Sequence, residues 1–270
     1  MAQGLSVPAA AVWAILAALF LTLVLPLGAA AFLGVKKKIS AMPFFVGVLG
    51  FFVSQMLLRI PLLTFLNTRD WYVRFASNPF ISAVLIGGLT AGLFEETARL
   101  AGARLFCKNR LEWKDALSYG LGHGLCEAVL LVGMSYLNAA VLAVLLNAGA
   151  LESLSPELAK TVASQLSDFE PASVLLGAGE RAPAVMFHIF ASVLVFLGVR
   201  RGRAGGYWLA VLLHTALNGG AVLLARYGNI WVSEGFLWAF GVLMLCLLPR
   251  LKKAFLPPSP EGADDMAGSP

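Results

Sequence analysis

The amino-acid sequence predicts an all-α fold, a polytopic membrane helix bundle. Of the 270 residues, 59% are apolar and 13% are charged, whereas soluble globular domains have roughly 45–50% apolar and about 25% charged residues. The mean hydropathy is +0.81, and several apolar runs reach the roughly 20 residues needed to cross a hydrocarbon core of about 30 Å. These observations exclude a soluble enzyme, a disordered tail protein and a disulfide-rich secreted domain.

Breaks in the hydropathy pattern separate seven apolar runs, and each run predicts one transmembrane helix. The runs cover residues 7–33, 43–66, 79–107, 116–149, 172–199, 206–226 and 230–249. The fourth is longer than one straight crossing requires, so we expect it to be tilted or to continue beyond the bilayer on the outer side. Residues 1–253 would form one membrane domain, and the Pro-, Gly- and Ser-rich residues 254–270 predict a disordered cytoplasmic tail.

The basic residues predict the orientation of the bundle. Twelve Lys and Arg residues follow the odd-numbered runs, whereas the opposite connections hold only four. The longest opposite connection, residues 150–171, is acidic. By the positive-inside rule, we expect the N-terminus outside and the C-terminus in the cytoplasm. Because the net charge of +5 gathers at the ends of apolar runs, it indicates membrane topology and no nucleic-acid partner.

The three cysteines lie in or beside apolar runs. They have no paired spacing of the kind that indicates a disulfide framework or a thiolate metal site. We therefore interpret Cys107, Cys126 and Cys246 as small core residues.

Polar side chains inside the apolar runs are the candidates for a functional site, because such groups are costly in a membrane unless they are paired, line water or perform chemistry. Counted from the cytoplasmic ends at about 1.5 Å per residue, four runs bring such groups to one layer. The layer contains all three histidines of the chain and comprises Glu95, Glu96, Arg99, His123, Glu127, His188, His214 and Asn218. Glu180 and Arg181 lie nearer the outer side; for this pair and for Arg59 we favour a structural role.

Glu95 and Glu96 are adjacent on one predicted helix, and Arg99 follows one turn later. This spacing lets the guanidinium partially neutralise the carboxylate of Glu95 and orient that of Glu96. Because adjacent helical residues are about 100° apart, only one of the two carboxylates can face the site fully. We favour Glu95 for this position, since it lies one turn from Arg99 and on the helix face shared with Gly92.

This set of side chains predicts hydrolysis at a buried site. A glutamate, or a metal held by histidines and a carboxylate, would activate water, while a histidine and an asparagine would stabilise the oxyanion. The candidate ligands for one zinc ion are His123, Glu127, His188 and His214. The alternative is a metal-free site in which a glutamate alone activates the water. A proton-coupled transporter and a non-catalytic membrane scaffold are the competing functions.

Three short motifs resemble those of the CAAX-protease and bacteriocin-processing family of intramembrane proteases. They are Glu95-Glu96-Thr97-Ala98-Arg99, Tyr119-x-x-x-His123 and His214-Thr215-Ala216-Leu217-Asn218. A tyrosine replaces the usual phenylalanine, and there is one residue fewer between the glutamates and the arginine. These departures, with the glycine-rich stretch that leads into Glu127, are more similar to the bacterial YhfC-like branch of intramembrane metalloproteases.

The resemblance implies cleavage of a peptide bond in a membrane-embedded or membrane-anchored protein or peptide. It implies a multi-pass enzyme of the cytoplasmic, or inner, cell membrane. Glu95 or Glu96 would be the base that activates water, and Arg99 would orient it.

The resemblance also implies roles for the remaining motif residues. His123 would be a partner of the water or a metal ligand, and His214 and Asn218 would donate hydrogen bonds to the oxyanion. His188 has no counterpart in the three motifs, and its depth makes it a candidate extra ligand. Glutamate-only and metal-assisted mechanisms are both proposed within the family, so zinc stays open at this point.

Overall fold

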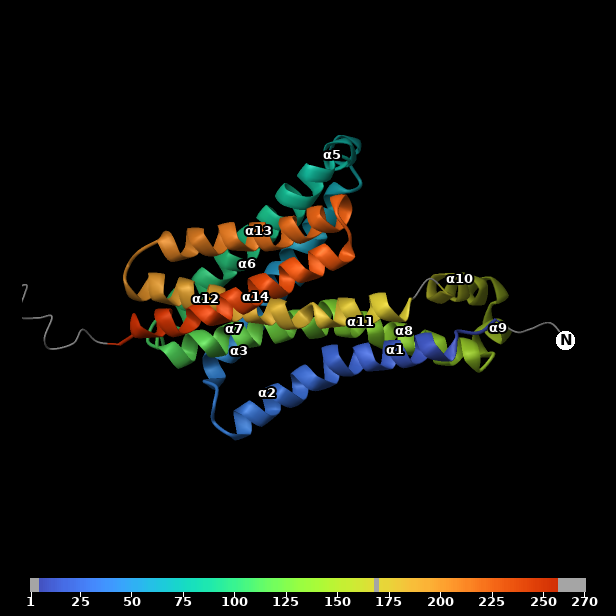
Figure 1. Ribbon diagram of the computed structural model, residues 1–270, viewed down its shortest axis with the longest axis horizontal. Helices are drawn as coiled ribbons and strands as arrows, with labels where there is room; N and C mark the ends of the chain where they lie inside the picture. The colour runs from blue at the N-terminus through green and yellow to red at the C-terminus, as the bar shows by residue number, and fades with distance from the viewer. Residues whose placement is uncertain (1–4, 168–169, 257–270) are drawn as a thin grey trace, which may run out of the picture.

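The computed structural model describes residues 5–167 and 170–256, which form helices and no β-strand (Figure 1). Seven helices in this part of the chain are long and apolar enough to cross a membrane. They are Ala9–Val35, Ala41–Leu66, Ile81–Phe106, Trp113–Asn147, Pro171–Arg200, Gly205–Tyr227 and Ile230–Lys253. Each coincides with one predicted apolar run, so the all-α fold class and the seven predicted spans are confirmed.

Short π-helical segments, labelled η, interrupt the first four spans. Such segments are rare and frequently mark functional sites. The elements up to Asn147 are α1 (Ala9–Leu19), η1 (Phe20–Val24), α2 (Leu25–Val35), α3 (Ala41–Phe51), η2 (Phe52–Arg59), α4 (Ile60–Leu66), α5 (Asp70–Ala76), η3 (Ile81–Leu89), α6 (Thr90–Ala101), η4 (Gly102–Phe106), α7 (Trp113–Glu127), η5 (Ala128–Gly133) and α8 (Met134–Asn147). The others are α9 (Ala150–Leu154), α10 (Pro156–Ser167), α11 (Pro171–Gly179), α12 (Arg181–Arg200), α13 (Gly205–Tyr227) and α14 (Ile230–Lys253).

Helix α12 is the centre of the bundle. Twelve of its 20 residues are buried, and it contacts α6, α7, α13 and α14. All the polar residues that the sequence assigns to one layer lie on α6, α7, α12 and α13. The helices that carry the predicted site are therefore packed around a common neighbour.

Glycines allow α3 and α7 to approach closely. A methyl group at Gly47 would overlap the main-chain carbonyl of Tyr119, and one at Gly122 would overlap the carbonyl of Phe44. Small residues at such positions let the backbones of transmembrane helices come into contact. This approach fixes the position of α7 and of the histidine at residue 123.

We expect Gly122→Ala to lower the free energy of unfolding by about 1–3 kcal/mol, because the added methyl group forces α3 and α7 apart. The matched control is Gly28→Ala, also within a helix, where the added methyl group would meet nothing within 4 Å. That exchange should be neutral or stabilising by roughly 0.5–1 kcal/mol. Unfolding in detergent measures both, and equal effects would contradict this account of the packing.

A second core lies beyond the main bundle, where α1, α8, α9, α10 and α11 meet (Figure 1). Its buried residues are mostly alanines. The fourth span has 35 residues, which makes it about 52 Å long, and its last part, α8, belongs to this core. The long fourth run therefore extends past the length of a hydrocarbon core of about 30 Å.

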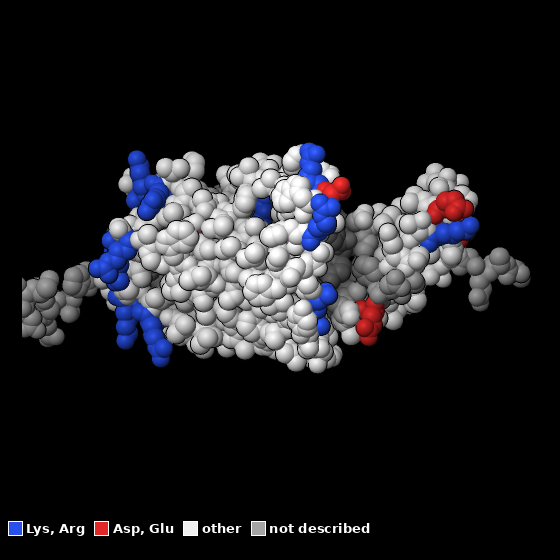
Figure 2. Space-filling view, turned by 90° about the horizontal axis from the view of Figure 1, so that it is seen from above, with Lys and Arg blue, Asp and Glu red and all other residues white. Residues whose placement is uncertain are grey.

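The two ends of the molecule differ in charge (Figure 2). Lys and Arg gather at the end where α2, α12 and α14 terminate, which carries 36–38, 200–203 and 250–253. We call this the basic end. The acidic groups visible in this view lie toward the opposite end, which carries α9 and α10 and which we call the α9–α10 end.

Most of the predicted tail is not described by the structure, and the cysteines differ in burial. Residues 257–270 of the tail lie outside the described residues, whereas Phe255 is buried and its ring meets the Trp113 ring edge-on. Cys107 is buried, and burial raises the pKa of its thiol to about 11. Cys126 is half-buried and Cys246 is exposed, so the interpretation of all three as core residues is wrong for Cys246.

Candidate active site

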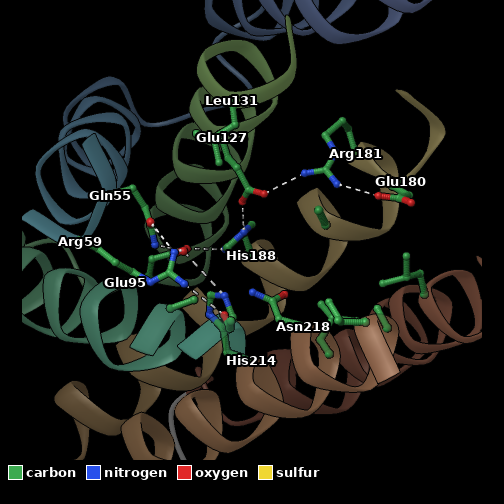
Figure 3. Close-up of a pocket in the computed structure, with 17 residues that line it drawn as sticks. Gln55, Arg59, Glu95, Glu127, Leu131, Glu180, Arg181, His188, His214 and Asn218 are labelled. Atoms are coloured by element: carbon green, nitrogen blue, oxygen red, sulfur yellow. Dashed lines mark hydrogen bonds and ion pairs between the residues drawn. The ribbon is translucent and has the colours of Figure 1, made fainter. Parts of the chain in front are cut away.

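The carboxylate of Glu95 lies at the centre of a buried polar cluster (Figure 3). Its Oε2 atom is 2.9 Å from Nε2 of His123 and 3.9 Å from Nδ1 of His188. Its Oε1 atom is 3.8 Å from Nε2 of His214. All four side chains are buried. The structure thus brings all three histidines of the chain around one glutamate, from four different helices.

Glu96 has a different environment, although it is the next residue. Arg99 donates from Nη1 to both of its carboxylate oxygens, at 2.9 and 3.2 Å. Its Oε1 atom is also 3.0 Å from Nδ1 of His214, which leaves Nε2 of that ring turned toward Glu95. Glu96 and Arg99 are fully buried. Arg99 therefore pairs with Glu96 and not, as the spacing predicts, with Glu95, and Glu95 lines the cavity.

His188 connects the cluster to a second ion pair. Nη2 of Arg99 is 3.0 Å from Nδ1 of His188, and because arginine only donates, this nitrogen accepts. Nε2 then carries the proton and donates to Oε2 of Glu127 at 2.6 Å. Oε1 of Glu127 accepts from Arg181 at 3.0 Å. Glu127 therefore lies behind His188, with both oxygens engaged, and not in the group around Glu95 where a predicted metal ligand would lie.

The Glu180–Arg181 pair is not isolated from the site. Arg181 donates to Glu180 at 3.2 Å as well as to Glu127, so the pair continues the polar chain from His188 (Figure 3). Its position is nearer the α9–α10 end than the histidines, as the sequence indicates. It therefore holds the carboxylate that orients His188.

Gln55 is a site residue that the sequence analysis does not identify. It is buried, and its amide nitrogen donates to Oε1 of Glu95. Its oxygen accepts from Arg59 at 3.1 Å. Arg59 in turn donates to the hydroxyl of Thr90 and to the carbonyl of Ile86 at 2.8 and 2.9 Å. In the sequence, Gln55 could have been found from its position four residues before Arg59 within one apolar run, because this spacing places both polar side chains on one helix face.

Glu95, His123 and His188 can hold a metal ion. Each offers one ligand atom, and these atoms lie within 4.8 Å of one another. The nitrogen of His188 that faces Glu95 is Nδ1, so a metal held there would replace the hydrogen bond from Arg99 to this nitrogen. Glu96 and Glu127 pair with arginines, whereas Glu95 has no Arg or Lys within 4.0 Å among the described residues. A buried carboxylate needs a compensating positive charge. Imidazole and carboxylate are ligands that zinc accepts, so the residues present fit a divalent metal.

The cluster forms one end of a cavity of about 300 Å³. Asn218 lies in its wall one turn after His214, with its amide near that ring (Figure 3). The described contacts include no hydrogen bond to this amide, so its N–H groups are free to donate. A carboxylate, imidazoles and an amide donor thus face the same small cavity. These are the functional groups that hydrolysis of a carbonyl compound requires.

Comparisons with known proteins give a consistent family. A family model described as YhfC intramembrane metalloprotease matches residues 21–237. The chain is also 31% identical to the uncharacterized membrane protein YhfC of Bacillus subtilis. The alignment has 207 residues and covers 75% of this chain and 80% of that protein. No solved structure matches the chain.

Proposed function

The chain belongs to the YhfC intramembrane metalloprotease family, and we propose that it is an intramembrane endopeptidase whose metal is held by Glu95, His123 and His188. The observation that carries this proposal is the Glu95 carboxylate, which is buried among histidines without an arginine or lysine partner in the described part of the chain. A divalent ion such as zinc would supply the missing positive charge. The substrate would be a membrane-embedded or membrane-anchored protein or peptide.

When bound, zinc lowers the pKa of a coordinated water to about 7 and polarises a carbonyl. Side chains of the protein would carry out the proton transfers. Nε2 of His214 would take the proton of the attacking water and deliver it to the leaving amine nitrogen as the C–N bond breaks. A water about 2.8 Å from each atom can bridge His214 and Glu95, whose facing atoms are 3.8 Å apart.

Three other residues would support this step. Glu96 accepts from Nδ1 of His214 and so fixes the tautomer with a free Nε2. Arg99 holds Glu96 from the opposite side. Asn218 would donate to the carbonyl oxygen as it becomes negative. This assignment differs from the roles that the motif resemblance implies. Glu95 would be a metal ligand and not the base, because it lies between two histidines that can share a metal with it, and His214 would be the base and not an oxyanion donor.

Metal content and cleavage together test the proposal. The purified protein should contain about one zinc per chain and should cleave an unfolded polypeptide such as β-casein in detergent. His123→Ala should lose both the metal and the cleavage. Asn218→Ala should keep the metal and lose cleavage by about 10²–10³-fold. Full cleavage by protein stripped of metal would contradict the metal assignment. Absence of cleavage by metal-loaded protein would contradict the proposed peptidase activity.

We further propose that the wider relationship is to the CAAX-protease and bacteriocin-processing family and that the protein spans the cytoplasmic membrane. In support, the three motifs bring Glu95, His123 and His214 together in one cluster. The concentration of Lys and Arg at the basic end also fits a cytoplasmic face.

The orientation gives a direct prediction. A reporter fused after Lys253 should be cytoplasmic, because that residue lies at the basic end. A cysteine in place of Leu154, which is 80% exposed at the α9–α10 end, should react with an impermeant thiol reagent on intact cells. Reaction of this cysteine only after the cells are opened would reverse the proposed orientation.

A further inference from the structure

The cavity at the cluster runs toward one end of the molecule only. On each helix, its lining residues lie level with the polar cluster or on its α9–α10 side. They include Arg59 on η2, Gly87 on η3, Leu131 on η5, Glu180 beside α12 and Val222 on α13. The spans run in alternating directions, so these residues come before the cluster in the sequence of some spans and after it in others. They nevertheless all lie on the same side of the cluster in space, which indicates that the cavity has one opening.

Exposure rises along the same direction. Gln55, Glu95 and His214 are at most 4% exposed at the inner end of the cavity. At its outer end, Leu131 is 37% exposed and Val222 is 50% exposed. The cavity therefore opens between η5 and α13 toward the α9–α10 end.

The opposite side of the cluster is closed by packed side chains. One to two turns toward the basic end, each helix presents a residue with 0% exposure. These residues are Phe51 on α3, Ala103 on η4, Tyr119 on α7, Phe196 on α12 and Ala210 on α13. We call them the plug. The rings of Phe51 and Tyr119 pack on His123 itself, with ring centroids 5.3 and 6.3 Å away.

We propose that water and the scissile segment of the substrate reach Glu95 from the α9–α10 end. The inference rests on the proposed peptidase function. It names the substrate class: a membrane protein or peptide that presents its scissile segment on the face opposite the basic end. A peptide bond presented at the basic end, such as that of a cytoplasmic C-terminus, is not a substrate, because the plug separates it from the site.

Cysteine accessibility tests the direction of access without any need for catalysis. Cys126 and Cys246 are first replaced by alanine, whereas Cys107 is fully buried and stays. Single cysteines then replace Ala184 and Ala221, two half-buried residues of the cavity wall. Right-side-out and inverted membrane vesicles are treated with a small, charged, impermeant methanethiosulfonate.

Both cavity cysteines should react only from the side on which Leu154→Cys reacts, and not from the side of Lys37→Cys. A cysteine in place of Ala103, in the plug, should react from neither side. Reaction of the cavity cysteines from the side of Lys37→Cys, or from neither side while the two end controls react, would overturn the proposal. Because labelling needs no turnover, correct labelling with no casein cleavage would instead reject the peptidase function.

Discussion

Replacement of Glu95 by Gln is expected to lower peptide cleavage by about 10³-fold or more and to remove the stoichiometric metal, while the protein stays folded. Gln keeps the volume of Glu but removes the charge that faces His123 and His188. Because Glu95 has no arginine or lysine within 4.0 Å among the described residues, the exchange breaks no direct ion pair with either residue type. Metal analysis tests the loss of metal, the cleavage rate tests the loss of activity, and the unfolding transition in detergent tests whether the protein stays folded.

Glu234→Gln is the matched control for this prediction. Glu234 is also a buried carboxylate within a span, on α14; it does not line the cavity and contacts Glu180, not the cluster around Glu95. The same exchange there should leave metal content and cleavage unchanged. If Glu95→Gln kept full activity, Glu95 would have no part in the mechanism. If it lost activity but kept its metal, the carboxylate would act as the base that the motif resemblance implies.

Much of this site could be predicted from the sequence because helix geometry is regular. Counting residues from the basic clusters placed Glu95, His123, His188 and His214 at one depth, since each residue adds about 1.5 Å. The 100° step between neighbours also separated Glu95 from Glu96. Both arguments use only properties of a single helix, and such properties carry over from sequence to structure.

The remaining features depend on how the helices are rotated and packed against one another. His123 and Glu127 share a helix face, yet Glu127 meets His188 and Arg181, not Glu95. The close packing of Gly124 against α12 sets this geometry, and no spacing within α7 encodes it. The partnership of Gln55 with Glu95 likewise joins residues 40 positions apart.

Replacement of Arg99 by Met is expected to lower the free energy of unfolding by about 3–5 kcal/mol, the cost of leaving a buried charge without its partner. Arg99 is fully buried and is the Arg partner of Glu96. It also holds the Glu96 carboxylate that fixes the tautomer of His214, so cleavage should be lost as well. Arg181→Met is the matched control. Its side chain is 20% exposed, so water can solvate the carboxylates that it leaves, and the loss of stability should be smaller.

The double variant Arg99→Met, Glu96→Gln separates the ion pair from the packing around it. It removes both buried charges, and replacement of a complete buried pair is often neutral or stabilising. Unfolding in mixed detergent micelles should therefore show that the double variant regains most of the stability lost in Arg99→Met. Cleavage should stay absent, because Gln is a poorer partner than Glu for the protonated His214 that the proposed step forms. A double variant as unstable as Arg99→Met would show that Arg99 stabilises the bundle by filling space and not by neutralising Glu96.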